Sequence, residues 1–95
     1  MARLTDVEIE RALQDLPGWE RDGDTIARSI RFPAFMDGIG FVSRVAEMAE
    51  AADHHPDIDI RYRNVRLVLS THTEGGLTAK DVALARQISE AIGEG

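Results

Sequence analysis

Apolar residues recur along this chain with two different periods, and the changes of period mark out its expected elements. Three stretches repeat at the helical spacing of three and four residues, and three shorter ones alternate with the period of two typical of strands; a hairpin signal indicates a fourth strand before them. We expect helices over residues 5–16, roughly 34–52 and 78–92, and strands over 19–21, 26–32, 58–62 and 65–70.

The ends of two helices carry capping signals. Thr5 can cap the amide of Glu8 while the Glu8 side chain reaches back to Thr5, a capping-box pattern, and Pro17 with the glycine after it ends this helix. Thr78 and Asp81 repeat a similar pattern at the start of the third helix.

The long helix has its apolar residues at helical spacing. The expected buried stripe consists of Phe35, Ile39, Val42, Val45, Ala46 and Ala49. Gly38 and Gly40 interrupt it, and each weakens a helix by about 1 kcal/mol relative to alanine. Two glycines so close together indicate close packing of this helix on the sheet.

The expected strands alternate between apolar and polar residues, with one exception in the second strand. Ile58, Ile60 and Tyr62 predict a strand with one buried face, followed by a turn at 63–64. In the second strand Arg28 lies on the apolar side, so we expect it near an edge where its charged head can reach water.

The order of elements is helix, two strands, helix, two strands, helix. Asp22 and Gly23 signal a tight hairpin between the first two strands, and hairpins give antiparallel pairs. We therefore predict an α+β fold (α-β-β-α-β-β-α) with a four-stranded, mainly antiparallel sheet and three helices packed on one face.

Composition narrows the function classes. The 95 residues predict one domain over 1–95, and the absence of cysteine leaves neither a disulfide framework nor a thiolate metal site. A net charge of −6 and a pI near 4.9 argue against nucleic-acid binding. The Arg61, Arg63 and Arg66 stripe is interpreted as a solvated face of two strands.

No apolar run reaches the roughly 20 residues that span a bilayer, and no secretion signal begins the chain, so we expect a cytoplasmic protein.

All three histidines fall between Glu50 and His72. His54 and His55 are adjacent in a loop closed by Pro56, and His72 follows the last strand, so a hairpin would bring them together. Histidine exchanges protons near neutral pH, which makes this stretch a candidate proton-transfer site. Glu50 lies four residues before His54, one helical turn if the helix persists, and could orient or charge an imidazole.

Structural interpretations of the same residues stay open. The histidine pair can end a helix whose dipole favours positive charge, and Glu50 can be an exposed helix-end carboxylate. His72 can be a capped strand-end residue, and Asp81 a capping acid with or without a second role facing the site. Adjacent histidines converge poorly on one ion and no HExxH pattern occurs, so we expect no metal.

Together these motifs resemble one family, the pterin-4a-carbinolamine dehydratases. The shared patterns are E-x-x-D-H-H-P at 50–56, S-T-H at 70–72, G-G-L-T-x-x-D at 75–81, R-x-I-x-F at 28–32 and Trp19 after Pro17-Gly18. They occur in the family's order and spacing over nearly the whole chain. Many members have an aromatic residue shortly after the proline, where this chain has Ile58, a departure that affects stacking there and leaves the acid–base residues intact.

The resemblance implies a dehydratase that removes water from 4a-hydroxytetrahydropterin to give the quinonoid dihydropterin, without a cofactor. It implies His54, His55 and His72 as catalytic residues and Glu50, Pro56, Thr71 and Asp81 as binding or supporting residues. It further implies a homodimer or homotetramer and a functional link to an aromatic amino-acid hydroxylase. The alternatives are a non-catalytic interaction protein, as in relatives that act as dimerisation cofactors for a transcription factor, or a pterin-binding assembly factor.

Overall fold

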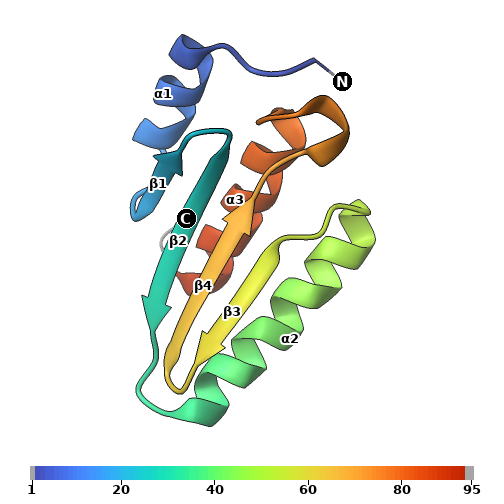
Figure 1. Ribbon diagram of the computed structural model, residues 1–95. Helices are drawn as coiled ribbons and strands as arrows, with labels where there is room; N and C mark the ends of the chain where they lie inside the picture. The colour runs from blue at the N-terminus through green and yellow to red at the C-terminus, as the bar shows by residue number, and fades with distance from the viewer. Residues whose placement is uncertain (1, 94–95) are drawn as a thin grey trace.

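The computed structural model describes residues 2–93, which form three α-helices, a four-stranded sheet and one short 3₁₀ helix (Figure 1). The elements are α1 (Asp6–Gln14), β1 (Trp19–Asp22), β2 (Thr25–Arg31), α2 (Phe35–Ala52), β3 (Asp57–Arg61), β4 (Asn64–Leu69), the 3₁₀ helix η1 (His72–Glu74) and α3 (Ala79–Ile92). The predicted order of helices and strands is confirmed.

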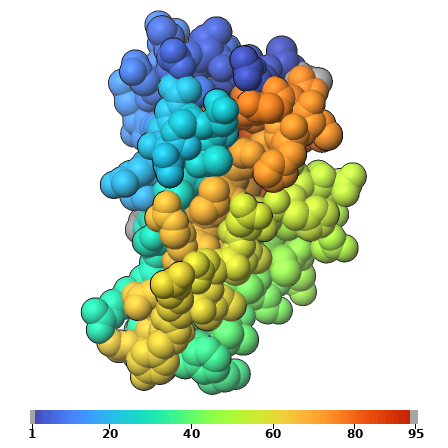
Figure 2. Space-filling model, viewed as in Figure 1, coloured from blue at the N-terminus to red at the C-terminus, as the bar shows by residue number. Residues whose placement is uncertain are grey.

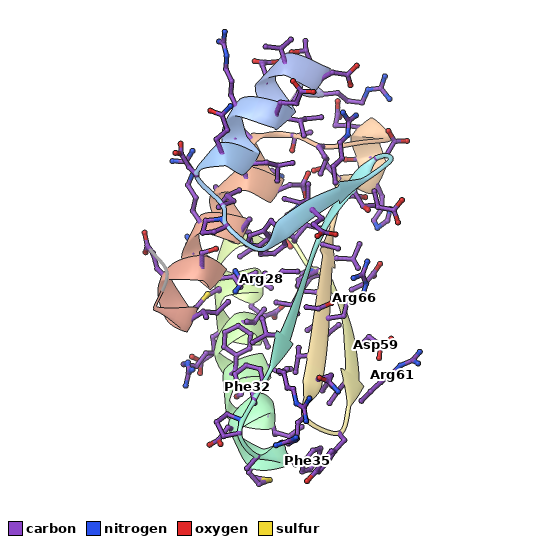
Figure 3. The ribbon with its side chains drawn as sticks, turned by 90° about the vertical axis from the view of Figure 1, so that its left-hand side faces the viewer. Arg28, Phe32, Phe35, Asp59, Arg61 and Arg66 are labelled. Atoms are coloured by element: carbon purple, nitrogen blue, oxygen red, sulfur yellow. The ribbon has the colours of Figure 1, made fainter. Side chains whose placement is uncertain are left out.

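The sheet has the strand order β1-β2-β4-β3, and every neighbouring pair is antiparallel. Two hairpins supply the outer pairs, and β2 pairs with β4 in the middle. The helices lie on one side of the sheet, while Asp59, Arg61 and Arg66 project from the other (Figure 3). The α+β class and the single helical layer are therefore as predicted.

The core lies between β4 and the helices. Val65, Leu67 and Leu69 are 0% exposed, whereas the alternate residues of β4 are not buried. Fully burying an aliphatic side chain of this size stabilises a fold by about 1.5–3 kcal/mol. Trp19 fills the same core from β1 and donates its indole N–H to Ser89 Oγ at 3.0 Å.

Both predicted capping boxes form. Thr5 accepts from the Glu8 amide, and the Thr5 amide donates to Glu8 at 2.8 Å. At α3 the Thr78 amide donates to Asp81 at 2.9 Å. The long helix also falls within one residue of its expected bounds. These features need only residues three or four apart, which explains why the sequence alone locates them.

The expected buried face of the third strand is wrong. All five residues of β3 are exposed, with Ile58 and Ile60 at 38% each, and Tyr62 belongs to the turn rather than to the strand. Because β3 is an edge strand and α2 contacts β4 more than β3, the inner face of β3 is only partly covered. Tyr62 has a φ of 54° and stacks on Phe35, with ring centroids 6.5 Å apart.

Two other expectations need correction. The Arg28 side chain is buried rather than at the water interface, and its Nη1 donates to the Pro17 carbonyl at 2.7 Å.

The buried side of α2 also differs from the expected one. On α2, Phe35 and Ala46 are exposed, whereas Phe41 is 1% exposed in the core. Apolar residues occupy more than one side of α2, so spacing alone does not determine which side packs on the sheet.

Gly38 confirms close packing of α2, and Gly40 does not. A Cβ atom at Gly38 would lie 3.3 Å from Phe32 and 3.4 Å from Val65, whereas one at Gly40 would meet nothing within 4 Å. Among the described residues, none of the helices is both long and apolar enough to cross a membrane.

Candidate active site

A fully buried carboxylate, Asp81, lies at the centre of the candidate site. It occupies the first turn of α3 and is 0% exposed. Its Oδ1 atom is 2.6 Å from His54 Nε2, and its Oδ2 atom accepts from the Thr71 hydroxyl at 2.7 Å and from the Thr78 amide at 2.9 Å. One carboxylate therefore caps α3 and binds an imidazole from the end of α2.

His54 reaches Asp81 because α2 ends abruptly. Asp53 adopts the left-handed conformation with φ at 49°, and the His54 amide donates back to the Ala49 carbonyl at 3.0 Å. This turn directs the chain towards the start of α3 and leaves His54 9% exposed. Pro56, half-buried, follows before β3 begins.

His54 reaches solvent through one ring nitrogen. Its Nδ1 atom has no hydrogen-bond partner within residues 2–93, and no buried side-chain nitrogen or oxygen in that part of the chain lacks a partner. It follows that Nδ1 is accessible, whereas Nε2 is committed to Asp81. A bound molecule can therefore exchange a proton with His54 at Nδ1.

His55 forms a second, exposed imidazole–carboxylate pair. Its Nε2 atom lies 2.5 Å from Glu50 Oε2, with side-chain exposures of 56% for His55 and 78% for Glu50. Glu50 thus contacts an imidazole as expected, but that of His55 rather than His54, because the helix ends at Ala52 and the following turn moves His54 away. The two adjacent rings therefore have different partners, and a residue before proline favours the extended backbone that turns such neighbouring side chains apart.

His72 lies in η1 rather than at a strand end, because β4 stops at Leu69. The segment returns on itself through a bridge between Thr71 and Gly76, and the His72 side chain is exposed. Residues 71–78 (orange) lie beside residues 50–56 (yellow-green), as Figures 1 and 2 show. The Thr71–Asp81–His54 hydrogen bonds join the segments that carry His72 and His54.

Thr78 is the member of this network that sequence reasoning missed. It was expected only as a helix cap, yet its hydroxyl also lies 2.8 Å from Thr71 Oγ1, and the residue is 0% exposed. The sequence signal for this contact is the pair of patterns S-T-H and G-G-L-T, which place one threonine at each end of a short loop.

The arginine stripe is separate from the histidines. Arg61 and Arg66, with Ser29 and Asp59, line a hollow of about 450 Å³. Figure 3 shows Asp59, Arg61 and Arg66 on the face of the sheet away from the helices. Arg63 instead lies over the Tyr62 ring and donates to the Pro33 carbonyl. The stripe is therefore two solvated strand residues and one turn residue.

The donor set of the site is imidazole, carboxylate and hydroxyl. Within residues 2–93, no group of three or more histidine, aspartate or glutamate side chains is arranged to hold a metal ion. Two imidazole–carboxylate pairs, one buried and one exposed, can donate and accept protons in different surroundings. Such an arrangement suits acid–base chemistry on a small molecule.

Comparison with known proteins gives a consistent result. A family model described as pterin 4 alpha carbinolamine dehydratase matches residues 2–91. A protein of Mycobacteroides abscessus with the provisional name pterin-4-alpha-carbinolamine dehydratase is 60% identical over 98% of this chain and 99% of its own length. A protein of Thermomicrobium roseum with the same provisional name is 54% identical over 95% of this chain and 97% of its own length.

Similar solved structures include the following two. A transcriptional coactivator/pterin dehydratase from Brucella melitensis has a TM-score of 0.90 and 37% identity, covering 94% of this chain and 97% of that one. A pterin dehydratase-like RuBisCO assembly factor of the alpha-carboxysome has a TM-score of 0.71 at 19% identity, covering 85% and 96%, which shows a shared fold alone. The family model and the high identity over full length decide the assignment: the chain belongs to the pterin-4-alpha-carbinolamine dehydratase family.

Proposed function

We propose that this chain eliminates water from a 4a-hydroxytetrahydropterin to give the quinonoid dihydropterin, with histidines as general acid and base. The observation that carries the proposal is the pair of imidazole–carboxylate contacts, His54 with buried Asp81 and His55 with exposed Glu50, in a member of this family. In the cytoplasm, the substrate would come from an aromatic amino-acid hydroxylase.

The elimination balances with proton transfers alone. The C4a–O bond breaks as the hydroxyl takes a proton and leaves as water, and the N5–H bond breaks as its electron pair forms the N5=C4a double bond. One group must donate a proton and another must accept one, and each positioned side chain contributes about 10²–10⁴-fold. The step uses neither an electron acceptor nor a covalent nucleophile.

The two pairs differ in their surroundings, which favours different roles. His54 is held by a buried carboxylate and exposes only Nδ1, so it can exchange a proton at one fixed position. His55 and His72 are exposed and can approach a flat heterocycle from solvent. We assign the three histidines to proton transfer and Glu50, Pro56, Thr71 and Asp81 to support.

The direct test follows the decay of freshly generated 4a-hydroxytetrahydropterin by absorbance. We expect wild-type protein to accelerate the decay, and His55→Ala and His72→Ala each to lower turnover by at least about tenfold. His54→Ala should also impair turnover. The double change of His55 and His72 should cost less than the product of the two single effects if they act as one unit.

Circular dichroism and thermal melting of each variant provide the control. His55 and His72 are exposed, so their replacement should leave folding nearly unchanged. Folded histidine variants that dehydrate the pterin at the wild-type rate would exclude this site. A wild-type protein that leaves the spontaneous decay unchanged would exclude the activity itself.

We also propose that the chain forms a homo-oligomer through the free edge of β3. All its residues are exposed, and edge strands with unpaired backbone groups associate readily. If two copies pair antiparallel about Ile60, Asp59 of each lies opposite Arg61 of the other. Pairing about Asp59 would oppose two aspartates, and pairing about Arg61 two arginines, which is destabilising. Charge therefore favours the register centred on Ile60.

A non-catalytic role is the second candidate. It is favoured by the apolar side chains exposed around the start of α2 and along β3, namely Phe35, Met36, Ile58, Ile60 and Tyr62. Such surfaces often mark contacts with other proteins. The transcriptional coactivator description of the Brucella melitensis structure is compatible with this role. The absorbance assay separates the two candidates, because an interaction protein would leave the pterin decay unchanged.

A further inference from the structure

The hydroxyl groups of Thr71 and Thr78 form a buried chain of hydrogen bonds that ends on Asp81. Thr71 Oγ1 lies 2.7 Å from Asp81 Oδ2 and 2.8 Å from Thr78 Oγ1. Thr78 Oγ1 is in turn 3.3 Å from the Lys80 amide nitrogen. Thr71 is 6% exposed, and Thr78 and Asp81 are 0% exposed, so these groups must satisfy one another.

Counting donors gives this chain a direction. An ionised carboxylate only accepts hydrogen bonds, so the Thr71 hydroxyl must donate to Asp81. A hydroxyl has one proton, which leaves the Thr71 oxygen to accept from Thr78. The Thr78 oxygen accepts from the Lys80 amide, which is a donor only. Every dipole therefore points its positive end towards Asp81.

This alignment fixes the proton on His54. The Thr71 hydroxyl, the Thr78 amide and the start of the fourteen-residue helix α3 all stabilise negative charge on Asp81. With Asp81 as an anion, the proton in the 2.6 Å contact belongs to His54 Nε2. In the neutral ring Nδ1 is then the bare, accessible nitrogen.

Thr71 also connects this network to His72. Its amide donates to the Gly76 carbonyl at 2.9 Å, and its carbonyl accepts from Glu74 at 3.0 Å. These bonds close the short loop that begins with His72. The same residue thus orients one histidine through its side chain and anchors the loop of the next through its backbone.

We propose that Thr71 and Thr78 are positioning residues, which hold His54 in the tautomer that has its proton on Nε2 and so leave Nδ1 to exchange protons with the substrate. The proposal rests on the dehydratase function for its effect on rate, whereas the tautomer is a property of the free protein. An imidazole in the wrong tautomer loses orders of magnitude in rate, so the effect should be large enough to measure.

The test combines nitrogen NMR of histidine-labelled protein with the absorbance assay. In the wild type, the ring-nitrogen shifts of neutral His54 should show a protonated Nε2 and a bare Nδ1. Thr71→Val keeps the side-chain shape but removes the hydroxyl, so we expect a mixture of tautomers, an altered pH–rate profile and turnover lowered by at least about tenfold. Thr71→Ser should restore all three.

Thr25→Val is the matched control. Its hydroxyl donates to the Asp22 carbonyl at the β1–β2 turn, away from this network, so tautomer and turnover should stay as in the wild type. If Thr71→Val stays folded with the wild-type tautomer and rate, or if wild-type Nδ1 has the proton, the proposal is overturned. If the tautomer depends on Thr71 as expected but no variant, including the wild type, dehydrates the pterin, the tautomer assignment is supported and the proposed function fails.

Discussion

The ionisation of Glu8 is coupled to folding, because the ionised side chain takes part in the capping box with Thr5. The hydrogen bond from the Thr5 amide, with the Thr5 hydroxyl, lowers the pKa of Glu8 below its ordinary value of 4.5. A carboxyl whose pKa is lower in the folded state stabilises the fold above its unfolded pKa, and this contribution disappears as the pH falls through the folded value. The cap should therefore weaken in acid.

We predict that Glu8→Gln reduces this sensitivity. Glutamine can still accept from the Thr5 amide but does not titrate, so its unfolding free energy should decrease less steeply than that of the wild type as the pH drops below 4.5. Chemical denaturation at a series of pH values measures the difference. Parallel pH profiles for the two proteins would contradict the assignment.

At the scale of elements, the two glycines of α2 differ in what surrounds them. Gly38 faces Phe32 and Val65 at 3.3–3.4 Å from the position of an added Cβ, whereas Gly40 faces open space. Glycine costs a helix about 1 kcal/mol relative to alanine at either position. Only at Gly38 does close packing against the sheet oppose the gain from substitution.

We therefore expect Gly40→Ala to stabilise the protein by about 0.5–1 kcal/mol. Gly38→Ala should gain less or lose stability, because a methyl group there forces Phe32 or Val65 to shift in a dense core. Urea denaturation of the two variants makes the comparison directly. Equal stabilisation by both would show that Phe32 and Val65 leave room for a methyl group at Gly38.

At the scale of the whole molecule, the free edge of β3 predicts how copies would assemble. The register centred on Ile60 places Asp59 and Arg61 of two copies opposite each other. Asp59→Arg or Arg61→Asp alone would oppose like charges and should weaken association, measured by sedimentation at micromolar concentration.

Mixing the two single variants separates contacts between copies from those within one copy. Within each variant the Asp59–Arg61 contact at 3.2 Å is lost, but a mixed pair regains opposite charges across the interface. We expect the equimolar mixture to associate more strongly than either variant. A wild-type protein that is only monomeric, or variants that assemble unchanged, would exclude this edge.

Sequence alone determines the features that depend on neighbours in the chain. The Thr5 and Thr78 caps, the hairpins and the alternation along β4 need contacts over a few residues. The caps and the alternation are found where predicted, and each hairpin turn lies one residue from its expected position, at 23–24 and 62–63. The histidine cluster is likewise visible as a motif. Local sequence patterns are enough to locate these features, because each signal involves residues a few positions apart or a simple period.

Tertiary structure alone decides which groups meet. Sequence spacing places Glu50 one helical turn before His54, whereas after the turn at Asp53 Glu50 contacts His55, and His54 contacts Asp81, 27 residues away. The exposure of β3 depends on where α2 packs. The burial of Phe41 depends on which face of α2 contacts the sheet. Such outcomes depend on the docking of α2 and α3 on the sheet, whose contacts join distant segments and leave no local pattern.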